Sequence, residues 1–118
     1  MTGTDHLMNP PSPWVQRFAK RIRQGGEVLD LACGGGRHAR WLAGEGWEEE
    51  AGDRHAGALA GLAGVPGVRV RVADLELGAW PYAGRHFAGI VVANYLHRPL
   101  LPLIEGVLDA GGVLIYET

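Results

Sequence analysis

The stretch "VLDLACGGGRHARW", residues 28–41, decides the fold. Residues 28–32 are mainly apolar and run into three consecutive glycines, Gly34 to Gly36, after which residues 37–43 restart a helical pattern. A strand, a glycine turn and a helix in this order form the first half of a βαβ unit. Glycine at such a turn permits tight backbone geometry and lets a ligand approach the main chain closely.

The same alternation continues along the chain. Ser12 and Pro13 predict a helix N-cap followed by proline at the first helical position. Further strands are expected at residues 47–52, 68–73, 87–93 and 113–116, and helices at residues 14–22, 37–43, 56–63 and 100–108. Strands that alternate with helices predict an α/β fold, a doubly wound and mostly parallel sheet with right-handed crossovers. In that architecture ligands bind beyond the carboxyl ends of the strands.

Length and composition restrict the function classes. The chain has 118 residues, a formal net charge of −2 and 47% hydrophobic residues, which is typical of a soluble globular domain without a general affinity for nucleic acid. The single cysteine excludes an internal disulfide framework. No apolar run has membrane-spanning length and no signal pattern opens the chain, so a cytoplasmic protein is expected. Abundant Gly, Ala and Arg beside one lysine, Lys20, indicate a GC-rich, bacterial genome. Residues 1–11 are expected to be a flexible lead-in and residues 12–118 a single domain.

The glycine turn by itself fits two cofactor classes. Gly34, Gly36 and Ala39 have the G-x-G-x-x-G/A spacing of dinucleotide-binding folds, although glycines can also serve only to turn the chain. Asp30 favours a different ligand, because a pyrophosphate gains nothing from a carboxylate at the preceding strand end. A ligand with an ammonium group and a carboxylate of its own, such as S-adenosylmethionine, would use both the acid and the free backbone N–H groups. The alternative for Asp30 is a capping role.

With these residues, the stretch resembles motif I of class I S-adenosylmethionine-dependent methyltransferases, D/E-x-G-x-G-x-G. Asp30, Gly34 and Gly36 match, and Ala32 replaces the first glycine. The resemblance implies a three-layer αβα Rossmann-like sandwich with sheet order 3-2-1-4-5 and S-adenosylmethionine as cofactor. It also implies that the loop cradles the methionine moiety through Asp30, Ala32, Cys33, Gly34 and Gly36.

The resemblance also covers the ends of the next strands. The acid that holds the ribose hydroxyls falls on Asp53, followed by Arg54, and the acid that meets the adenine amine falls on Asp74, with Leu75 beside the ring. The segment after the fourth strand, "ANYLHRPLL", places Asn94 and Tyr95 near the donor methionine. The alternatives are a solvated turn for Asp53, a turn cap for Asp74 and a core-covering role for Tyr95.

No catalytic base and no acceptor can be assigned. His38 and His97 are expected near the ligand face, but a lone histidine is more often solvent-exposed than a base. The five histidines have no metal-ligand spacing, so no metal is expected, and no base accompanies Cys33. The sequence "NYLH" differs from the N/D-P-P-Y/F/W signature that the resemblance would tie to amino-group methylation of nucleic-acid bases.

Two segments depart from the family pattern. Glu48, Glu49 and Glu50 occupy the expected second strand, which predicts irregular or mobile structure there. Family members usually continue past the fifth strand with closing strands that this sequence lacks. We therefore expect an open strand edge that is covered by self-association, giving a homo-oligomer.

Three functional hypotheses remain. The first is a methyltransferase with an unassigned acceptor, for which a small molecule is one candidate. The second is a catalytically incomplete module that binds S-adenosylmethionine or S-adenosylhomocysteine and works with a partner or as an oligomer. The third is an NAD(P)-binding oxidoreductase domain, which the glycine spacing supports and Asp30 and Asp74 disfavour.

Overall fold

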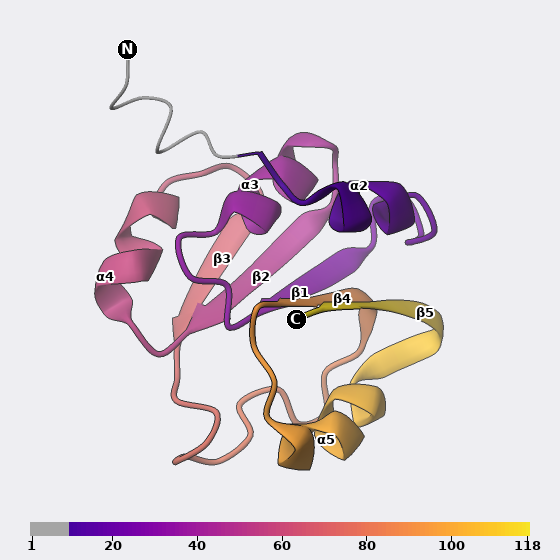
Figure 1. The fold of residues 1–118 in the computed structure, drawn as a ribbon. Coiled ribbons are helices and arrows are strands. Elements are labelled where there is room, and N and C mark those ends of the chain that lie inside the picture. Colours follow the sequence, from indigo (N-terminus) through magenta and orange to yellow (C-terminus); the bar gives the residue numbers. More distant parts are fainter. Residues whose placement is uncertain (1–9) are drawn as a thin grey trace.

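A computed structural model describes residues 10–118 of the chain, so residues 1–9 of the expected lead-in lie outside the described residues. The described residues form one five-stranded sheet in the order β3-β2-β1-β4-β5, and every pair of neighbours is parallel (Figure 1). The strands are β1 (Glu27–Leu31), β2 (Glu48–Asp53), β3 (Val68–Val72), β4 (Phe87–Ala93) and β5 (Leu108–Glu117). The predicted α/β class and sheet order are therefore confirmed.

Helices cover both faces of the sheet (Figure 1). The helical segments are α2 (Pro13–Ala19), α3 (Arg37–Gly44), α4 (Ala56–Leu59), the 3-10 turn η1 (Ala60–Leu62), the 3-10 turn η2 (Arg98–Leu100) and α5 (Leu101–Gly106). On one face Val15 and Leu42 pack with Val28 and Val91 of the central strands. On the other face Ile104 packs with Leu29, Ile90 and the buried ring of Tyr82. Two apolar layers on a parallel sheet make the three-layer sandwich.

The sequence predicted where α2 starts more accurately than where the helices end. Ser12 caps α2, because its hydroxyl accepts the N–H of Val15 at 3.0 Å and Pro13 takes the first turn, as predicted. The helix ends at Ala19, three residues before the expected end. The expected helix at residues 56–63 is divided into α4 and η1, and the helix expected at residues 100–108 ends at Gly106.

The last strand is longer than expected. The apolar run at residues 113–116 predicts four residues, whereas β5 extends over Leu108–Glu117. Leu108 pairs with Phe87 and Val113 pairs with Gly89, so an irregularity between them lets the strand continue through the glycines at 111 and 112.

The prediction of irregular structure at Glu48–Glu50 is wrong. β2 pairs in continuous register with β1 and with β3. Glu48 is exposed, and Glu50 is buried but accepts hydrogen bonds from arginine side chains, namely Arg69, Arg71 and Arg85. Glu49 faces the other side of the strand and is fully buried, and burial raises its carboxyl pKa to about 10. The strand forms because one glutamate is solvated, one is ion-paired and one stays uncharged at neutral pH.

Among residues 10–118, no helix has the length and hydropathy needed to cross a membrane.

Candidate functional site

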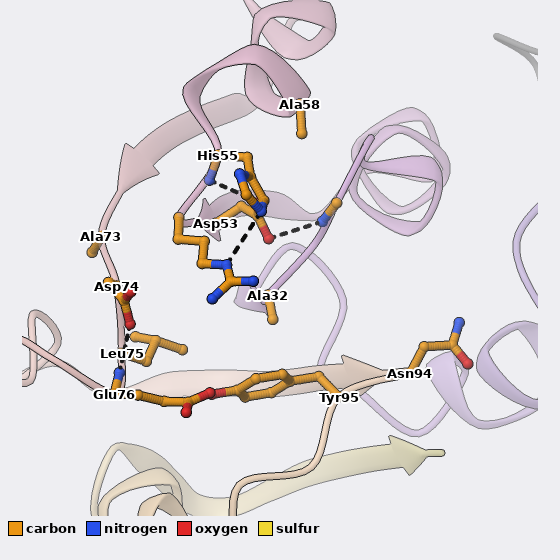
Figure 2. A pocket seen from close by; sticks show the side chains of 12 residues that line it. Ala32, Asp53, His55, Ala58, Ala73, Asp74, Leu75, Glu76, Asn94 and Tyr95 are labelled. Atoms are coloured by element: carbon orange, nitrogen blue, oxygen red, sulfur yellow. Dashed lines mark hydrogen bonds between the residues drawn. The ribbon is translucent and has the colours of Figure 1, made fainter.

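A pocket of about 360 Å³ lies at the carboxyl ends of four strands, the place where the sequence predicts the site (Figure 2). Each strand is followed by residues that line it. They are Ala32 and Gly34 after β1, Asp53, Arg54, His55 and Ala58 after β2, Ala73, Asp74, Leu75 and Glu76 after β3, and Asn94 and Tyr95 after β4.

Most of the predicted site residues line this pocket: Ala32, Gly34, Asp53, Arg54, Asp74, Leu75 and Asn94. The other three, Asp30, Cys33 and Gly36, are not among its lining residues. Asp30 is buried beneath the turn in β1, Cys33 lies within it and Gly36 caps α3. That any of the ten binds a cofactor remains a prediction.

The glycine turn has backbone angles that explain its composition. Gly34 and Gly36 have φ of 57° and 83°, the left-handed region that favours glycine. Ala32 also has a positive φ, 54°, at the position where the family motif has glycine. A Cβ at Gly36 would lie 2.5 Å from a methyl carbon of Leu62 in η1. The turn is therefore tight because its backbone is left-handed at three positions and α3 starts directly against η1.

Asp53 ties the turns after β1 and β2 together. Its Oδ1 accepts the backbone N–H of Gly34 at 3.3 Å and its Oδ2 accepts that of His55 at 3.0 Å. Arg54 donates from Nε to Nε2 of His55 at 3.2 Å, one of the hydrogen bonds marked in Figure 2. Each carboxylate oxygen retains further acceptor capacity, so Asp53 can bind a ligand hydroxyl while it holds the turn.

Opposite Asp53, the loops after β3 and β4 are connected by a small polar network. Asp74 accepts the N–H of Glu76 at 3.0 Å, which is the turn-capping role weighed for it, while the residue also lines the pocket. Tyr95 donates its hydroxyl to Glu76 at 2.9 Å, and Nδ1 of His97 lies 3.8 Å from the same carboxylate. Burial and Glu76 raise the pKa of Tyr95 to about 12, so its hydroxyl remains a donor at neutral pH. Tyr116 donates to the Tyr95 carbonyl at 2.8 Å and anchors the segment to β5.

Asp30 is the most perturbed acid next to the pocket. It is 2% exposed, and its Oδ2 has no hydrogen-bond partner. Burial raises the pKa of Asp30 to about 7; a hydrogen bond from the Ala39 backbone lowers it, the charge of Asp53 raises it, and Arg37 lowers it. A carboxylate of this kind gains most from a cationic partner.

The nucleophile and base candidates do not assemble a catalytic set. Burial raises the pKa of the Cys33 thiol, which donates to the Gly34 carbonyl at 3.4 Å and stays protonated. His38 is buried and accepts the backbone N–H of Ser12 at 3.1 Å, and burial lowers its pKa to about 4. The expectation that His38 lies near the ligand face is wrong, because the side chain is bonded to the start of α2. His97 is paired with Glu76 and is not among the lining residues.

Four residues that line the pocket were not predicted from the sequence: His55, Ala58, Ala73 and Glu76. Ala73 and Glu76 flank Asp74 and Leu75, so the strand-end rule that selected Asp74 could have included them. His55 and Ala58 belong to the turn and helix after β2, and no residue pattern marks them.

Solved structures match the chain over most of its length. A TehB-like S-adenosylmethionine-dependent methyltransferase from Corynebacterium glutamicum matches with a TM-score of 0.76 at 22% identity, over 96% of this chain and 66% of its own. DhpI, solved as a complex with S-adenosylhomocysteine, has a TM-score of 0.73 at 23% identity, over 99% of this chain and 57% of its own. The glycopeptide N-methyltransferase MtfA, complexed with S-adenosylmethionine, has a TM-score of 0.67 at 27% identity, over 85% and 51%.

No protein-family model and no curated protein matches the chain. The structural matches nevertheless agree with the fold and its sheet order. The fold is a Rossmann-like αβα sandwich, and it is that of class I S-adenosylmethionine-dependent methyltransferases. The chain spans 33% to 66% of the length of the solved structures it matches.

Proposed function

We propose that the pocket binds S-adenosylmethionine and that the protein is a methyltransferase that uses it. The observation that carries the proposal is the placement of three acids on or just beyond three adjacent strands. Asp53 and Asp74 line the pocket, and Asp30 is buried in β1 beneath the glycine turn that borders the pocket. A dinucleotide would bring its pyrophosphate to the start of α3, where Asp30 and Asp53 would repel it. MtfA and DhpI, which have this fold, were solved with S-adenosylmethionine and S-adenosylhomocysteine respectively.

The described residues fit such a ligand. The unpartnered Oδ2 of Asp30 would accept the ammonium group, and the left-handed turn would present backbone N–H groups to the ligand's carboxylate. The carboxylate of Asp53 has acceptor capacity for ribose hydroxyls. Asp74 would accept a hydrogen bond from the adenine amine at the edge of the ring, and Leu75 would pack against the face of the ring. Ala32, Asn94 and Tyr95 complete the lining, and Tyr95 reaches Glu76 beside Leu75 (Figure 2).

When bound, S-adenosylmethionine supplies a methyl group on a positively charged sulfur. The contribution of this chain is to hold the donor in one orientation and to exclude water from one side of it. In the pocket lining the Tyr95 hydroxyl donates to Glu76, and its pKa is raised to about 12, so it stays protonated at neutral pH. Positioning is therefore the chemistry we assign to this chain. A small-molecule acceptor with a nucleophilic atom of its own is the acceptor class we propose.

The test is calorimetric titration with S-adenosylhomocysteine and, in parallel, with NADH. We expect saturable binding of S-adenosylhomocysteine and none of NADH. Asp74→Asn should weaken the binding, because an amide replaces the carboxylate expected to accept from the adenine amine, whereas Asp109→Asn on β5 outside the pocket should not. Binding of NADH in preference to S-adenosylhomocysteine would establish the oxidoreductase alternative instead.

The second candidate is a binding module that does not transfer methyl groups unaided. It is favoured because the groups in the pocket lining that could act as bases are already hydrogen-bonded within the protein. They are Asp53 with the backbone of Gly34 and His55, His55 with Arg54, Asp74 with the Glu76 backbone, and Glu76 with Tyr95. A turnover assay with radiolabelled donor against a panel of amine, hydroxyl and thiol acceptors separates the two. Transfer to any acceptor supports the enzyme, and tight binding without transfer supports the module.

We also propose that the protein self-associates through β5, which lies at one end of the sheet and pairs only with β4 (Figure 1). An unpaired edge presents backbone donors and acceptors that another strand can satisfy. Light scattering should give a dimer or larger species. A monomer at micromolar concentration, with fast amide exchange along β5, would contradict the proposal.

A further inference from the structure

A second buried acid lies beside Asp30. In the β1–β2 register Val28 pairs with Glu49 and Asp30 pairs with Ala51. Side chains two residues apart on a strand share a face, so Asp30 and Glu49 are diagonal neighbours on the same face of the sheet. Glu49 has no exposed surface and Asp30 is 2% exposed.

These two carboxyl groups leave three oxygens without partners. Oδ2 of Asp30 and both oxygens of Glu49 are buried and have no hydrogen bond in the described structure. Buried polar groups are nearly always paired, since an unpaired one costs about 1–3 kcal/mol. Central parallel strands usually consist of apolar residues. The presence of a buried glutamate without a hydrogen-bond partner in β2 therefore needs a physical explanation.

The surroundings fix which of the two acids carries charge. Burial and the charge of Asp30 together raise the pKa of Glu49 to about 10, so Glu49 is protonated at neutral pH. Facing Asp30, α3 contributes the positive charge of Arg37 and a backbone N–H, and β2 contributes the negative charge of Asp53. The Cys33 thiol and the His38 ring are uncharged at neutral pH because burial shifts both pKa values. Asp30 is thus the acid that changes its charge near neutral pH.

We propose that Glu49 is a positioning residue for the donor-binding acid: its carboxylic O–H donates to the unpartnered Oδ2 of Asp30 when a cationic ligand binds, and binding expels one proton from Asp30. The inference rests on the proposed function and adds a proton linkage to it. Before binding in mildly acidic solution both carboxyl groups hold a proton. On binding, Asp30 releases its proton to solvent and pairs with the ligand's ammonium group, while Glu49 keeps its own proton.

The linkage has a defined direction with pH. Asp30 must be ionised to bind the ammonium group, and its pKa is raised to about 7. Affinity should therefore rise by about tenfold per pH unit below pH 7 and level off above it. Proton release should approach one per ligand near pH 5.5 and fall towards zero at pH 8.

The ligand itself provides a control. S-Adenosylhomocysteine carries the ammonium group, whereas methylthioadenosine has the same nucleoside without the amino-acid portion. Titration of both in buffers of different ionisation enthalpy measures the number of protons released. We expect release with S-adenosylhomocysteine only.

Three variants of adjacent glutamates isolate the role of Glu49. Glu49→Gln keeps a hydrogen-bond donor and should retain the pH profile. Glu49→Leu removes the donor, which leaves the Asp30 carboxylate unsatisfied in the complex and should weaken binding several-fold at pH 8, where Asp30 is already ionised. Glu48→Gln is the matched control, because Glu48 is exposed on the same strand.

The outcomes separate this inference from the proposed function. Binding of S-adenosylhomocysteine without proton release, or with unchanged affinity at pH 8 in Glu49→Leu, would overturn the inference and leave the proposed function intact. Absence of S-adenosylhomocysteine binding would overturn both. The proton count on the unmodified protein requires no variant, so it tests the linkage even if Glu49→Leu does not fold.

Discussion

Gly52 and Tyr82 provide a sharp test of how the sheet is packed beneath the pocket. Gly52 lies in β2, one residue before Asp53, and the Tyr82 hydroxyl occupies the space that a side chain at Gly52 would need. Tyr82 is fully buried, and its ring packs edge-on against Trp80 and Phe87 with centroids 5.3 and 6.0 Å away. The ring therefore has little room to move.

The expected effect of Gly52→Ala depends on that hydroxyl. In the unmodified protein the added methyl group meets the hydroxyl oxygen, and overpacking a core costs about 1–3 kcal/mol. With Tyr82→Phe the oxygen is gone, and the next atoms are Cζ of the ring at 3.5 Å and the Arg71 carbonyl oxygen at 3.8 Å, which are ordinary contacts. There Gly52→Ala should be neutral or stabilising by about 0.5–1 kcal/mol, because alanine is favoured over glycine within a strand.

The assay is urea unfolding of the four proteins of this double-mutant cycle. Tyr82→Phe alone should be neutral or slightly stabilising, because the buried hydroxyl has no hydrogen-bond partner. The predicted coupling between the two substitutions is about 1–3 kcal/mol, the free energy of the clash alone, because the preference of the strand for alanine is present in both backgrounds and cancels. An equal cost of Gly52→Ala in both backgrounds would refute the packing argument.

Three further predictions concern the glycine turn, Asp53 and His38. In the glycine turn, Gly36→Ala should destabilise by about 2–4 kcal/mol, from its positive φ and its contact with η1, whereas Gly35→Ala, with open space and no positive φ, should change stability by less than about 1 kcal/mol in urea unfolding. Asp53→Ala should weaken S-adenosylhomocysteine binding by about ten- to a hundredfold in calorimetry, the value of one or two charge-assisted hydrogen bonds, and unchanged affinity would remove Asp53 from the site. His38 has its pKa lowered to about 4 by burial, so its stabilising contribution is present above pH 6.5 and is lost as the pH falls towards 4. The difference in unfolding free energy between the unmodified protein and His38→Gln should shrink over that range, and a constant difference would contradict the assignment.

Much of the fold could be predicted because it depends on local patterns. The apolar run from Phe87 to Ala93 predicts a strand buried on both faces, and the structure gives it these same bounds. Ser12 predicts the start of α2, because a helix cap depends only on residues within one turn. Helix ends were less predictable. After Ala19 the backbone of α2 continues with i→i+3 hydrogen bonds, and Ile22 is buried in the core although it lies beyond the end of the helix, so its apolar side chain did not mark a helical position.

The sequence alone determined the alternation of strands and helices, the glycine turn and the acids near the strand ends, because periodicity and turn chemistry act over a few residues. The sheet order followed from the family resemblance. The burial and the charge state of the glutamates in β2 were decided only by the tertiary structure. Glu50 is tolerated there because arginine side chains from β3 and from the segment before β4 form ion pairs with it. Glu49 is tolerated because burial and the charge of Asp30 raise its pKa, so the carboxyl group is uncharged. Such partners are distant in sequence, and the free energy of a buried charge depends on what surrounds it in space.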